Sequence, residues 1–324
     1  MLPGCSEGLL ELAQRAFPIE SRPFLRLSEM SSSEEDEVLK VLRYLKEEGV
    51  IRRIGAVLEP RKLGFEPVLL AFSVGGDRLE EVGSRMAGYS QVTHCYQRDG
   101  SEYNLWVVAV ERKGHLDGLL RELADLEGVR RALVLKCERT YKLATTFGRE
   151  GVLGPTTEKV QTSENTGGPP PLRLLRSLSD IPLARRPFLE VAEGLGMSED
   201  EVISRIEKLV NSGLVRRFGA VLDHTKVGFS ENALVLWSTG DPDELGAAFA
   251  KLPWVSHCYL RRAYAIGPHI PPSSISFCGV YTMVHARSGR ELKDRISRMR
   301  EVAGAEPSVF YTVRCFKKGS FEPG

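Results

Sequence analysis

Residues Gly49 to Phe65 read GVIRRIGAVLEPRKLGF, and the chain repeats this stretch at Gly213 to Phe229 as GLVRRFGAVLDHTKVGF. Ten of the seventeen positions are identical at a constant offset of 164 residues. A second motif, VTHCYQR at Val92 to Arg98, returns as VSHCYLR at Val255 to Arg261 with an offset of 163. Repeats in the same order and at nearly the same offset identify the 324-residue chain as a tandem duplication.

Upstream of the repeated stretch, apolar residues follow a helical period. Glu7 to Ala16, Arg22 to Glu29 and Ser33 to Glu48 are predicted helices. Ser33 with Asp36, and Ser198 with Glu201 in the second half, resemble capping boxes. Gly49 and Gly213 end the third helix of each half. A short hairpin wing is expected next, at Val50 to Val57 and at Leu214 to Val221, so each half should begin with a winged helix-turn-helix.

Downstream, the period changes to that of strands separated by two helices. The predicted elements of the first half are 68–74, 79–87, 92–98, 103–111, 116–127 and 129–137, and those of the second are 233–238, 243–250, 255–261, 280–287, 291–300 and 308–313. This β-α-β-β-α-β order is ferredoxin-like. The sequence therefore predicts an α+β fold, a tandem duplication of a winged helix-turn-helix plus a ferredoxin-like domain.

Domain boundaries follow from these patterns. Residues 148–171 are rich in Gly, Pro, Thr and Ser without apolar periodicity, which is typical of a linker. We expect a winged helix-turn-helix at 1–66, a ferredoxin-like domain at 67–147, then the linker, a second winged helix-turn-helix at 172–230 and a second ferredoxin-like domain at 231–324. The two halves are expected to form an intramolecular pseudo-dimer through their sheets, and a homo-oligomer is possible.

Composition excludes several classes of protein. The 44 basic and 43 acidic residues give a formal charge of +1, which provides no general attraction to nucleic acid or to an anionic membrane. The six cysteines lack Cys-x-x-Cys spacing, so neither a zinc ribbon nor a covalent haem is indicated. No basic leader and no run of 18 apolar residues occurs, so we expect a cytoplasmic protein with free thiols.

The duplicated Val92 to Arg98 motif carries the candidate site. In a strand, His94, Tyr96 and Arg98 share one face, and His257, Tyr259 and Arg261 repeat that face. A solvated sheet face needs polarity only, whereas these same three residue types recur in order, which favours a function. Imidazole, phenol and guanidinium in a row suit an anionic, partly aromatic ligand. Thr93, Cys95 and Gln97 are expected on the other face.

Other candidates carry weaker signals. His285 lies on a strand next to His257 and is a candidate second imidazole, although a lone strand histidine is more often structural. Lys62 and Lys226 could reach an anionic substituent, but exposed lysines usually only interact with water. Two further sets are read as structural: Cys95 and Cys258 as packing residues under the sheet, and the glycines at 55, 64, 219 and 228 as turn residues.

The order of domains resembles the Lrp/AsnC architecture. The string R-R-x-G-A-V-L-x-x-x-K-x-G-F, followed by [ST]-H-C-Y-x-R and Y-N-L-W, is similar more particularly to the siroheme decarboxylases of the alternative haem and haem d1 pathways. In that family two homologous subunits act as a pair, and this chain looks like both subunits fused. The resemblance covers nearly all residues outside the linker.

The resemblance implies siroheme as substrate, with loss of CO2 from its C12 and C18 acetates to give 12,18-didecarboxysiroheme. It implies catalytic roles for His94 and His257. The other positions that match the family are Arg52, Arg53, Tyr96, Arg98, Tyr103, Arg216, Arg217, Tyr259 and Arg261. All of these except Arg52 and Arg216 are candidate substrate-binding residues, and His285 is added to them as the second imidazole. No protein-bound metal and no cofactor are expected, because the iron tetrapyrrole is the substrate and its macrocycle can accept the electrons. The histidines could donate protons or ligate the iron.

Two alternatives belong to other functional classes. The architecture suits a transcription regulator that senses a small molecule or haem, but the third helices begin with Glu34, Glu35, Asp36 and Glu37 and with Glu199, Asp200 and Glu201, which repel DNA phosphates. DNA binding is therefore not expected. Amino-acid sensing, the usual task of Lrp-like effector domains, ranks third.

The second half departs from the family pattern at Arg262 to Cys278, which reads RAYAIGPHIPPSSISFC where the first half has a tight Asp99-Gly100 turn and then Tyr103-Asn104. We expect a loop here that leaves His257 and Arg261 without a short anchor. The first half should then hold its catalytic row more firmly than the second.

Overall fold

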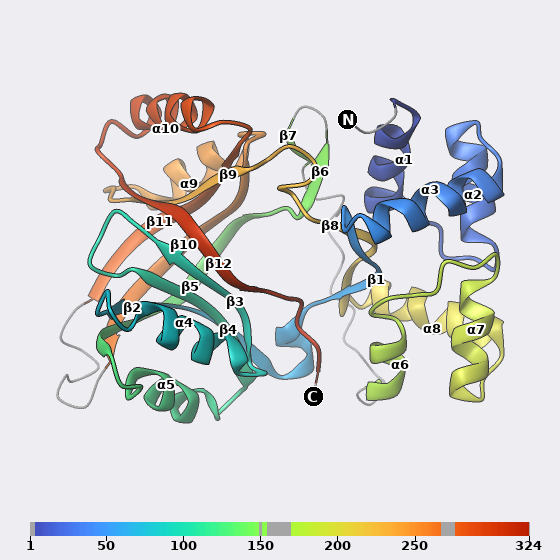
Figure 1. Cartoon of the computed structure of the whole chain (residues 1–324), viewed down its shortest axis with the longest axis horizontal. Coiled ribbons are helices and arrows are strands. Elements are labelled where there is room, and N and C mark those ends of the chain that lie inside the picture. The colour runs from blue at the N-terminus through green and yellow to red at the C-terminus, as the bar shows by residue number, and fades with distance from the viewer. Residues whose placement is uncertain (1–3, 149–150, 154–169, 267–275, 324) are drawn as a thin grey trace. The chain divides into compact units, whose positions relative to one another are not determined.

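The computed structural model describes residues 4–148, 151–153, 170–266 and 276–323. These residues form two compact units, and each unit draws on both halves of the chain. The first, here called the HTH unit, comprises residues up to 63, 145–228 and those from 322 (Figure 1). The second, the barrel unit, comprises 64–144 and 229–321. The chain passes between units close to the proposed boundaries 66/67 and 230/231.

The HTH unit contains two similar sets of three helices. These are α1 (Gly4–Arg15), α2 (Pro23–Ser31) and α3 (Glu35–Glu47), and α6 (Leu172–Ser177), α7 (Pro187–Leu195) and α8 (Glu199–Asn211). Proline at the first position of α2 and α7 suits a helix start, where its missing N–H is not needed. Ser198 caps α8 by accepting from the Glu201 N–H, as predicted. The cap predicted at Ser33 is wrong, since α3 begins after Glu34 with no side-chain cap.

The predicted hairpin wing is also wrong. Strand β1 (Ile51–Leu58) pairs with β8 (Val215–Leu222) of the other half, antiparallel, with Gly55 opposite Gly219. A Cβ at Gly55 would lie 2.3 Å from the Leu178 carbonyl oxygen that follows α6, and one at Gly219 would lie 2.4 Å from the Ala13 oxygen of α1. These glycines therefore permit close packing between halves and do not make turns. Gly64 and Gly228 do have left-handed φ, +79° and +97°.

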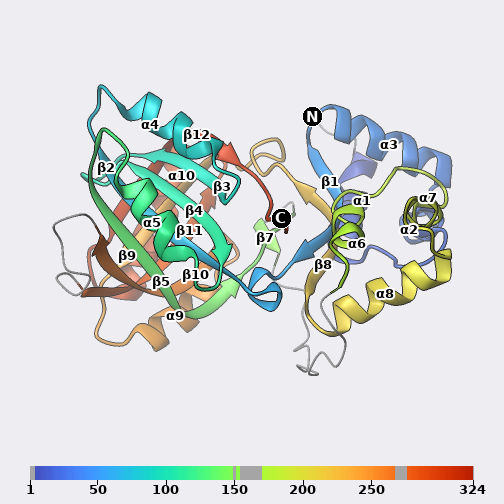
Figure 2. The ribbon, with the colours of Figure 1, turned by 90° about the horizontal axis from the view of Figure 1, so that it is seen from below.

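The barrel unit consists of two ferredoxin-like halves, which confirms that prediction. The first contains β2 (Phe65–Val74), α4 (Leu79–Gly88), β3 (Val92–Arg98), β4 (Leu105–Arg112), α5 (Leu116–Ala124) and β5 (Val129–Leu143); the second contains β9 (Glu231–Trp237), α9 (Pro242–Ala250), β10 (Val255–Ile266), β11 (Ser276–Ala286), α10 (Gly289–Ala303) and β12 (Ser308–Lys318). Each half has the strand order 4-1-3-2. Edge strands pair across halves, β5 with β10 and β12 with β3, and close an eight-stranded barrel (Figure 2).

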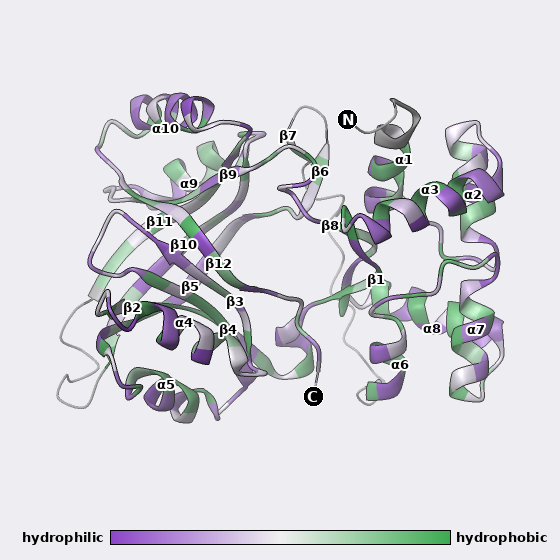
Figure 3. Ribbon diagram, in the orientation of Figure 1, coloured by the Kyte–Doolittle hydropathy of each residue, from purple (hydrophilic) through white to green (hydrophobic). Residues whose placement is uncertain are grey.

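The four helices cover the outside of this barrel. Helix α10 is hydrophilic over much of its length (Figure 3), and its apolar residues Leu292, Ile296 and Met299 are spaced to bury one stripe against the strands. Leu105 and Val107 of β4 point into the core beneath α4 and α5, whereas Trp106 between them belongs to a different cluster. Because strand side chains alternate, that cluster lies inside the barrel. Its buried members are Ala71, Trp106, Leu135, Leu234, Ala263, Tyr281 and Phe310.

The predicted linker lies mostly outside the described residues. Its first part forms β7 (Gly151–Leu153), which pairs with β6 (Thr146–Gly148) in the HTH unit. No helix in the part of the chain that the structure describes is long and apolar enough to cross a membrane.

Candidate functional site

The two His–Tyr–Arg rows lie on opposite walls of the barrel. In the closed strand order β10-β11-β9-β12-β3-β4-β2-β5, four antiparallel steps separate β3 from β10 in either direction. The two strands therefore run the same way, and both rows begin at the same end of the barrel. Cys95 and Cys258 point into the helix-covered cores, so the alternating His, Tyr and Arg side chains face inward.

Within each row the side chains contact one another. The rings of His94 and Tyr96 lie 6.1 Å apart between centroids, and the Arg98 Cζ atom lies 5.3 Å from the Tyr96 centroid. In the second half, the His257 and Tyr259 rings are 6.0 Å apart and the Arg261 Cζ atom is 4.6 Å from the Tyr259 centroid. Both guanidinium groups are within cation–π distance of their tyrosine. The shared face expected from strand alternation is present in both halves.

A hydroxyl group holds each histidine at Nδ1. Thr93 Oγ1 lies 3.0 Å from His94 Nδ1, and Ser256 Oγ lies 2.7 Å from His257 Nδ1. Both hydroxyl residues sit where the strand register shifts, between 92 and 94 and between 255 and 257. Such bulges re-aim a side chain, which explains why Thr93 contacts His94 although alternation placed it on the other face. The repeated Ser/Thr before His was the available sequence signal for this contact.

His285 is buried next to the second row, with 4% of its surface exposed. Its Nε2 atom lies 2.8 Å from Ser256 Oγ, so Ser256 lies between two imidazoles. The register of β4 and β11 makes Val110 the first-half equivalent of His285. The polar environment of the two rows therefore differs at this position.

Arg98 and Arg261 connect the two halves. Arg98 is 3% exposed, and its Nη1 donates to the Phe310 carbonyl at 3.2 Å and to Thr312 Oγ1 at 2.8 Å, both on β12. Arg261 Nη1 donates to the Leu135 carbonyl on β5 at 3.0 Å. Burial lowers the pKa of Arg98 to about 10, which still leaves it charged at neutral pH. No carboxylate is bonded to Arg98 among the described residues, so its positive charge is not neutralised locally.

Tyr103 packs at the edge of the interior cluster, and its carbonyl accepts a hydrogen bond from Trp106 Nε1 at 2.8 Å. Burial raises the pKa of the Tyr103 phenol. Its neighbour Asn104 has a structural role, since its amide bonds both main-chain groups of Val74 at 2.9 and 3.0 Å.

The expectation that the second row lacks an anchor is wrong. Strand β10 continues from Arg261 to Ile266, paired with β5 on one side and with β11 up to Tyr264 on the other. Arg261 thus lies inside a three-stranded segment, opposite both Cys137 and Gly279. Residues 267–275 of the predicted loop lie outside the described residues.

Arg53 and Arg217 belong to the HTH unit. Each donates to the main chain in or just after a helix of the other half. Arg53 Nη1 donates to the Ala56 and Ser179 carbonyls at 3.0 and 2.6 Å, and Arg217 Nη1 donates to Ala220 and Gln14 at 2.9 and 2.7 Å. Burial lowers both pKa values, that of Arg217 to about 10. The sequence missed this structural role because one acceptor of each arginine, Ser179 for Arg53 and Gln14 for Arg217, lies in the opposite half of the chain.

The remaining candidates are structural. Lys62 Nζ donates to the Ser212 carbonyl, and Lys226 Nζ to the Glu48 carbonyl, so each lysine caps the C-terminus of the other half's helix. The Cys95 and Cys258 thiols contact the carbonyls of Gly83 in α4 and Gly246 in α9, which confirms their packing role. Burial raises the pKa of both thiols to about 12.

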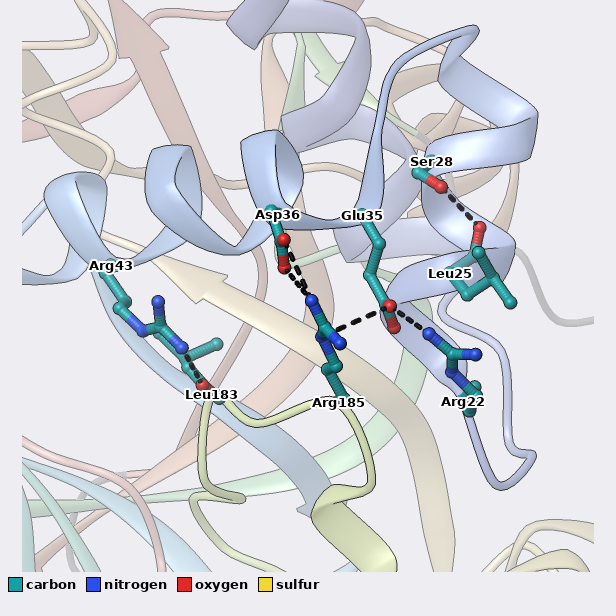
Figure 4. Close-up of polar contacts among 8 residues, drawn as sticks. All are labelled: Arg22, Leu25, Ser28, Glu35, Asp36, Arg43, Leu183 and Arg185. Atoms are coloured by element: carbon teal, nitrogen blue, oxygen red, sulfur yellow. Dashed lines mark hydrogen bonds and ion pairs between the residues drawn. The ribbon is translucent and has the colours of Figure 1, made fainter.

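The N-terminus of α3, which would face DNA in a regulator, is occupied by intramolecular contacts (Figure 4). Buried Glu35 pairs with Arg22 of its own half, while Arg185 of the other half makes two 2.9 Å contacts with Asp36. Farther along α3, Arg43 donates to the Leu183 carbonyl at 2.7 Å. Glu199, at the start of α8, pairs likewise with Arg186. Asp36 at the start of α3 thus joins the halves, and so does Glu199 at the start of α8, which accepts a hydrogen bond from Ser21 Oγ of the first half at 3.0 Å.

Comparison with known proteins identifies relatives of the whole chain. The family model "AsnC-like ligand binding domain" matches residues 62–142 and 226–317, and "Siroheme decarboxylase NirDL-like HTH domain" matches 7–52 and 173–216. The siroheme decarboxylase of Hydrogenobacter thermophilus is 32% identical over 96% of this chain and 92% of its own length. The siroheme decarboxylase NirDL subunit of Paracoccus pantotrophus is 31% identical over 96% and 94%.

A solved structure is similar along its whole length. It is the siroheme decarboxylase NirDL in complex with an iron-uroporphyrin III analogue, with a TM-score of 0.69 and 26% identity over 98% of this chain and 94% of that chain. Both halves of the present chain, helical and barrel parts alike, are therefore accounted for by one family. From its duplicated motifs, its fold and these relatives, the chain belongs to the siroheme decarboxylase family, in the form that carries both halves in one polypeptide.

Proposed function

We propose that the chain removes CO2 from the C12 and C18 acetate groups of siroheme, giving 12,18-didecarboxysiroheme for haem or haem d1 synthesis. The observation that carries this proposal is the pair of inward-facing His–Tyr–Arg rows, which start from the same end of the barrel on opposite walls. Two equivalent rows suit a substrate that undergoes the same reaction twice. The iron-uroporphyrin complex of a relative supports a tetrapyrrole as ligand.

The arginines supply electrostatic attraction in this proposal. Siroheme carries several carboxylates, and a buried guanidinium such as Arg98 favours an anion far more than an exposed lysine would. Because Arg98 and Arg261 are also bonded to carbonyl groups across the halves, their charges are held in fixed positions. Tyr96 and Tyr259, each between a histidine and an arginine, provide aromatic surface for the macrocycle. A direct role in substrate binding for Tyr103 and for Arg53 and Arg217 stays a prediction.

The histidines act as general acids in the proposed reaction. The bond between the acetate carbon and CO2 breaks, its electron pair enters the conjugated macrocycle, and a proton from imidazole completes the methyl group. The Thr93 hydroxyl donates to the Val108 carbonyl at 3.2 Å and so accepts from His94 Nδ1. This arrangement makes Nε2 the nitrogen that transfers the proton. No electron acceptor is consumed, so no resident cofactor is required.

A transcription regulator is the second candidate, and the HTH unit is the observation that favours it. The contacts of Glu35 and Asp36 argue against it. At the start of α3, where a DNA-binding helix carries groups that bind phosphate, this chain has carboxylates that are paired with its own arginines. We also propose a cytoplasmic location. It is supported by the five cysteines that the structure describes, all of which are free thiols.

The test is turnover of siroheme under anaerobic conditions, with the mono- and didecarboxylated products separated by liquid chromatography and identified by mass. We expect His94→Ala and His257→Ala each to slow one of the two CO2 losses by about a hundredfold or more. His115→Ala, at an exposed histidine before α5, is the matched control and should react like the unaltered protein. Full conversion by both His94→Ala and His257→Ala would exclude the proposed acids.

A further inference from the structure

The second half contains a hydrogen-bonded chain of His257, Ser256 and His285, and at the position of His285 the first half has a valine. His257 Nδ1 lies 2.7 Å from Ser256 Oγ, which lies 2.8 Å from His285 Nε2. In the first half, Thr93 Oγ1 lies 3.0 Å from His94 Nδ1, and its hydrogen is directed to the Val108 carbonyl. Val110 occupies the position equivalent to His285, and its side chain offers no polar atom.

A hydroxyl group has one hydrogen, so the two imidazoles are not independent. If Ser256 donates to His285 Nε2, it must accept from His257 Nδ1, which then carries the hydrogen. If Ser256 instead donates to His257 Nδ1, a neutral His257 carries its hydrogen on Nε2. The protonation of each ring therefore constrains the other. For His94 no such choice exists, because a carbonyl oxygen can only accept.

The surroundings keep His285 in place. Its peptide N–H donates to the Trp254 carbonyl at 3.0 Å, and its carbonyl accepts from Arg295 Nη1. Arg295 in turn pairs with Glu291 at 2.6 Å. Among the charged groups on the elements around His285, Arg295 of α10 bonds its carbonyl, Glu291 pairs with Arg295, Glu231 of β9 is paired with the next residue, Ala286, and Arg287 follows β11. With only 4% of its surface exposed, His285 can exchange protons most directly through Ser256.

We propose that His285 is a positioning and proton-relay residue for His257, so that the proton donor of the second half is an imidazole pair joined by Ser256. When the pair holds one extra proton on His285, His257 gives its Nε2 proton to the substrate carbon. At the same time the Ser256 proton passes to His257 Nδ1, and the His285 Nε2 proton passes to Ser256. Both imidazoles finish neutral and one proton has moved. This inference rests on the proposed function.

Three substitutions test the relay. His285→Val reproduces the first-half residue, Ser256→Ala removes the hydroxyl, and Ser256→Thr keeps it in the form that the first half uses. We expect His285→Val and Ser256→Ala to slow one CO2 loss by about tenfold and to shift its pH profile over the range in which imidazole titrates, about pH 5 to 8. The other CO2 loss should not change. Ser256→Thr should keep the original profile.

Val110→Ala is the matched control, because it alters the equivalent buried position of the other half without touching an imidazole. It should leave both pH profiles unchanged. The two hypotheses fail in different ways. If the unaltered protein releases no CO2 from siroheme, the proposed function is wrong, whereas the relay is read without substrate from the tautomer of His257 in ¹⁵N-histidine spectra. An unchanged His257 tautomer in folded His285→Val protein, or pH profiles that superimpose on those of the unaltered protein, would overturn the relay.

Discussion

Gly55→Ala should destabilise the HTH unit severely, although it adds only one methyl group. The added Cβ would lie 2.3 Å from the Leu178 carbonyl oxygen and 2.5 Å from that of Ser179. Cβ atoms in proteins essentially never lie closer than 3.0 Å to another heavy atom. The backbone after α6 must therefore move away by about 0.7 Å. Both clashing atoms belong to the backbone and cannot rotate away.

The cost follows from the bonds that cross this contact. The Ala56 N–H donates to Leu178 and the Ile181 N–H to Ile54, both at 2.7 Å, and Arg53 donates to Ser179 at 2.6 Å. Overpacking costs about 1–3 kcal/mol, and weakening these hydrogen bonds adds about 0.5–1.5 kcal/mol for each one lost. We expect the free energy of unfolding to fall by about 3–5 kcal/mol, a large part of the stability of an ordinary domain.

Urea unfolding followed by far-UV circular dichroism measures this change. With a slope of about 2 kcal/mol/M, the midpoint should fall by about 2 M. The three tryptophans, at 106, 237 and 254, all lie in the barrel unit, so their fluorescence follows that unit separately. Gly194→Ala in α7 is the matched control: its Cβ would have no atom within 4 Å, and it should stabilise by about 0.5–1 kcal/mol. A Gly55→Ala midpoint equal to that of the unaltered protein would refute the close-packing argument.

Three further predictions concern the site and its surroundings. Arg98→Met should weaken siroheme binding about tenfold or more in a Soret titration, because a charged hydrogen-bonding group is worth about 1.5–3 kcal/mol; unchanged affinity would remove Arg98 from the proposed anion site. Cys95 and Cys258 should resist iodoacetamide at pH 8 in the folded protein, since a pKa of about 12 keeps both as thiols, while the exposed Cys315 reacts first, as peptide mass mapping can establish. Fluorescence anisotropy should detect no binding of a generic DNA duplex even at low salt, and salt-sensitive binding would instead support the regulator.

The sequence alone predicted the helices of the first half and the ferredoxin-like elements with their order, because apolar period and turn residues are local properties; the predicted wings are single strands, and the β6–β7 pair was not predicted. It could not predict which copy pairs with which. Strands β1 and β8 have nearly the same sequence, so local pattern cannot distinguish a hairpin within a half from pairing between halves. The structure shows the pairing between halves in the register of β1 with β8, and the close approach at Gly55 and Gly219 accompanies it.

The candidate rows were predictable for the same local reason, since alternation fixes the face of His94, Tyr96 and Arg98. The contacts beyond each row were not. Thr93 reaches His94 only because of a one-residue register shift, which no residue type in the motif requires. The contact of Ser256 with His285 spans 29 residues and two strands, and the bonds of Arg98 span more than 200 residues.

Pairing of β1 with β8, β5 with β10 and β12 with β3 means that neither half completes its own fold. Two separate chains with these interfaces would have to meet in solution, and their assembly would depend on concentration. In one polypeptide the second half is always present at an effective concentration in the millimolar range. The ratio of halves is then fixed at one to one, and pairing of two identical halves is disfavoured. Each half is therefore free to mutate in a different direction, as the exchange of valine for histidine between positions 110 and 285 illustrates.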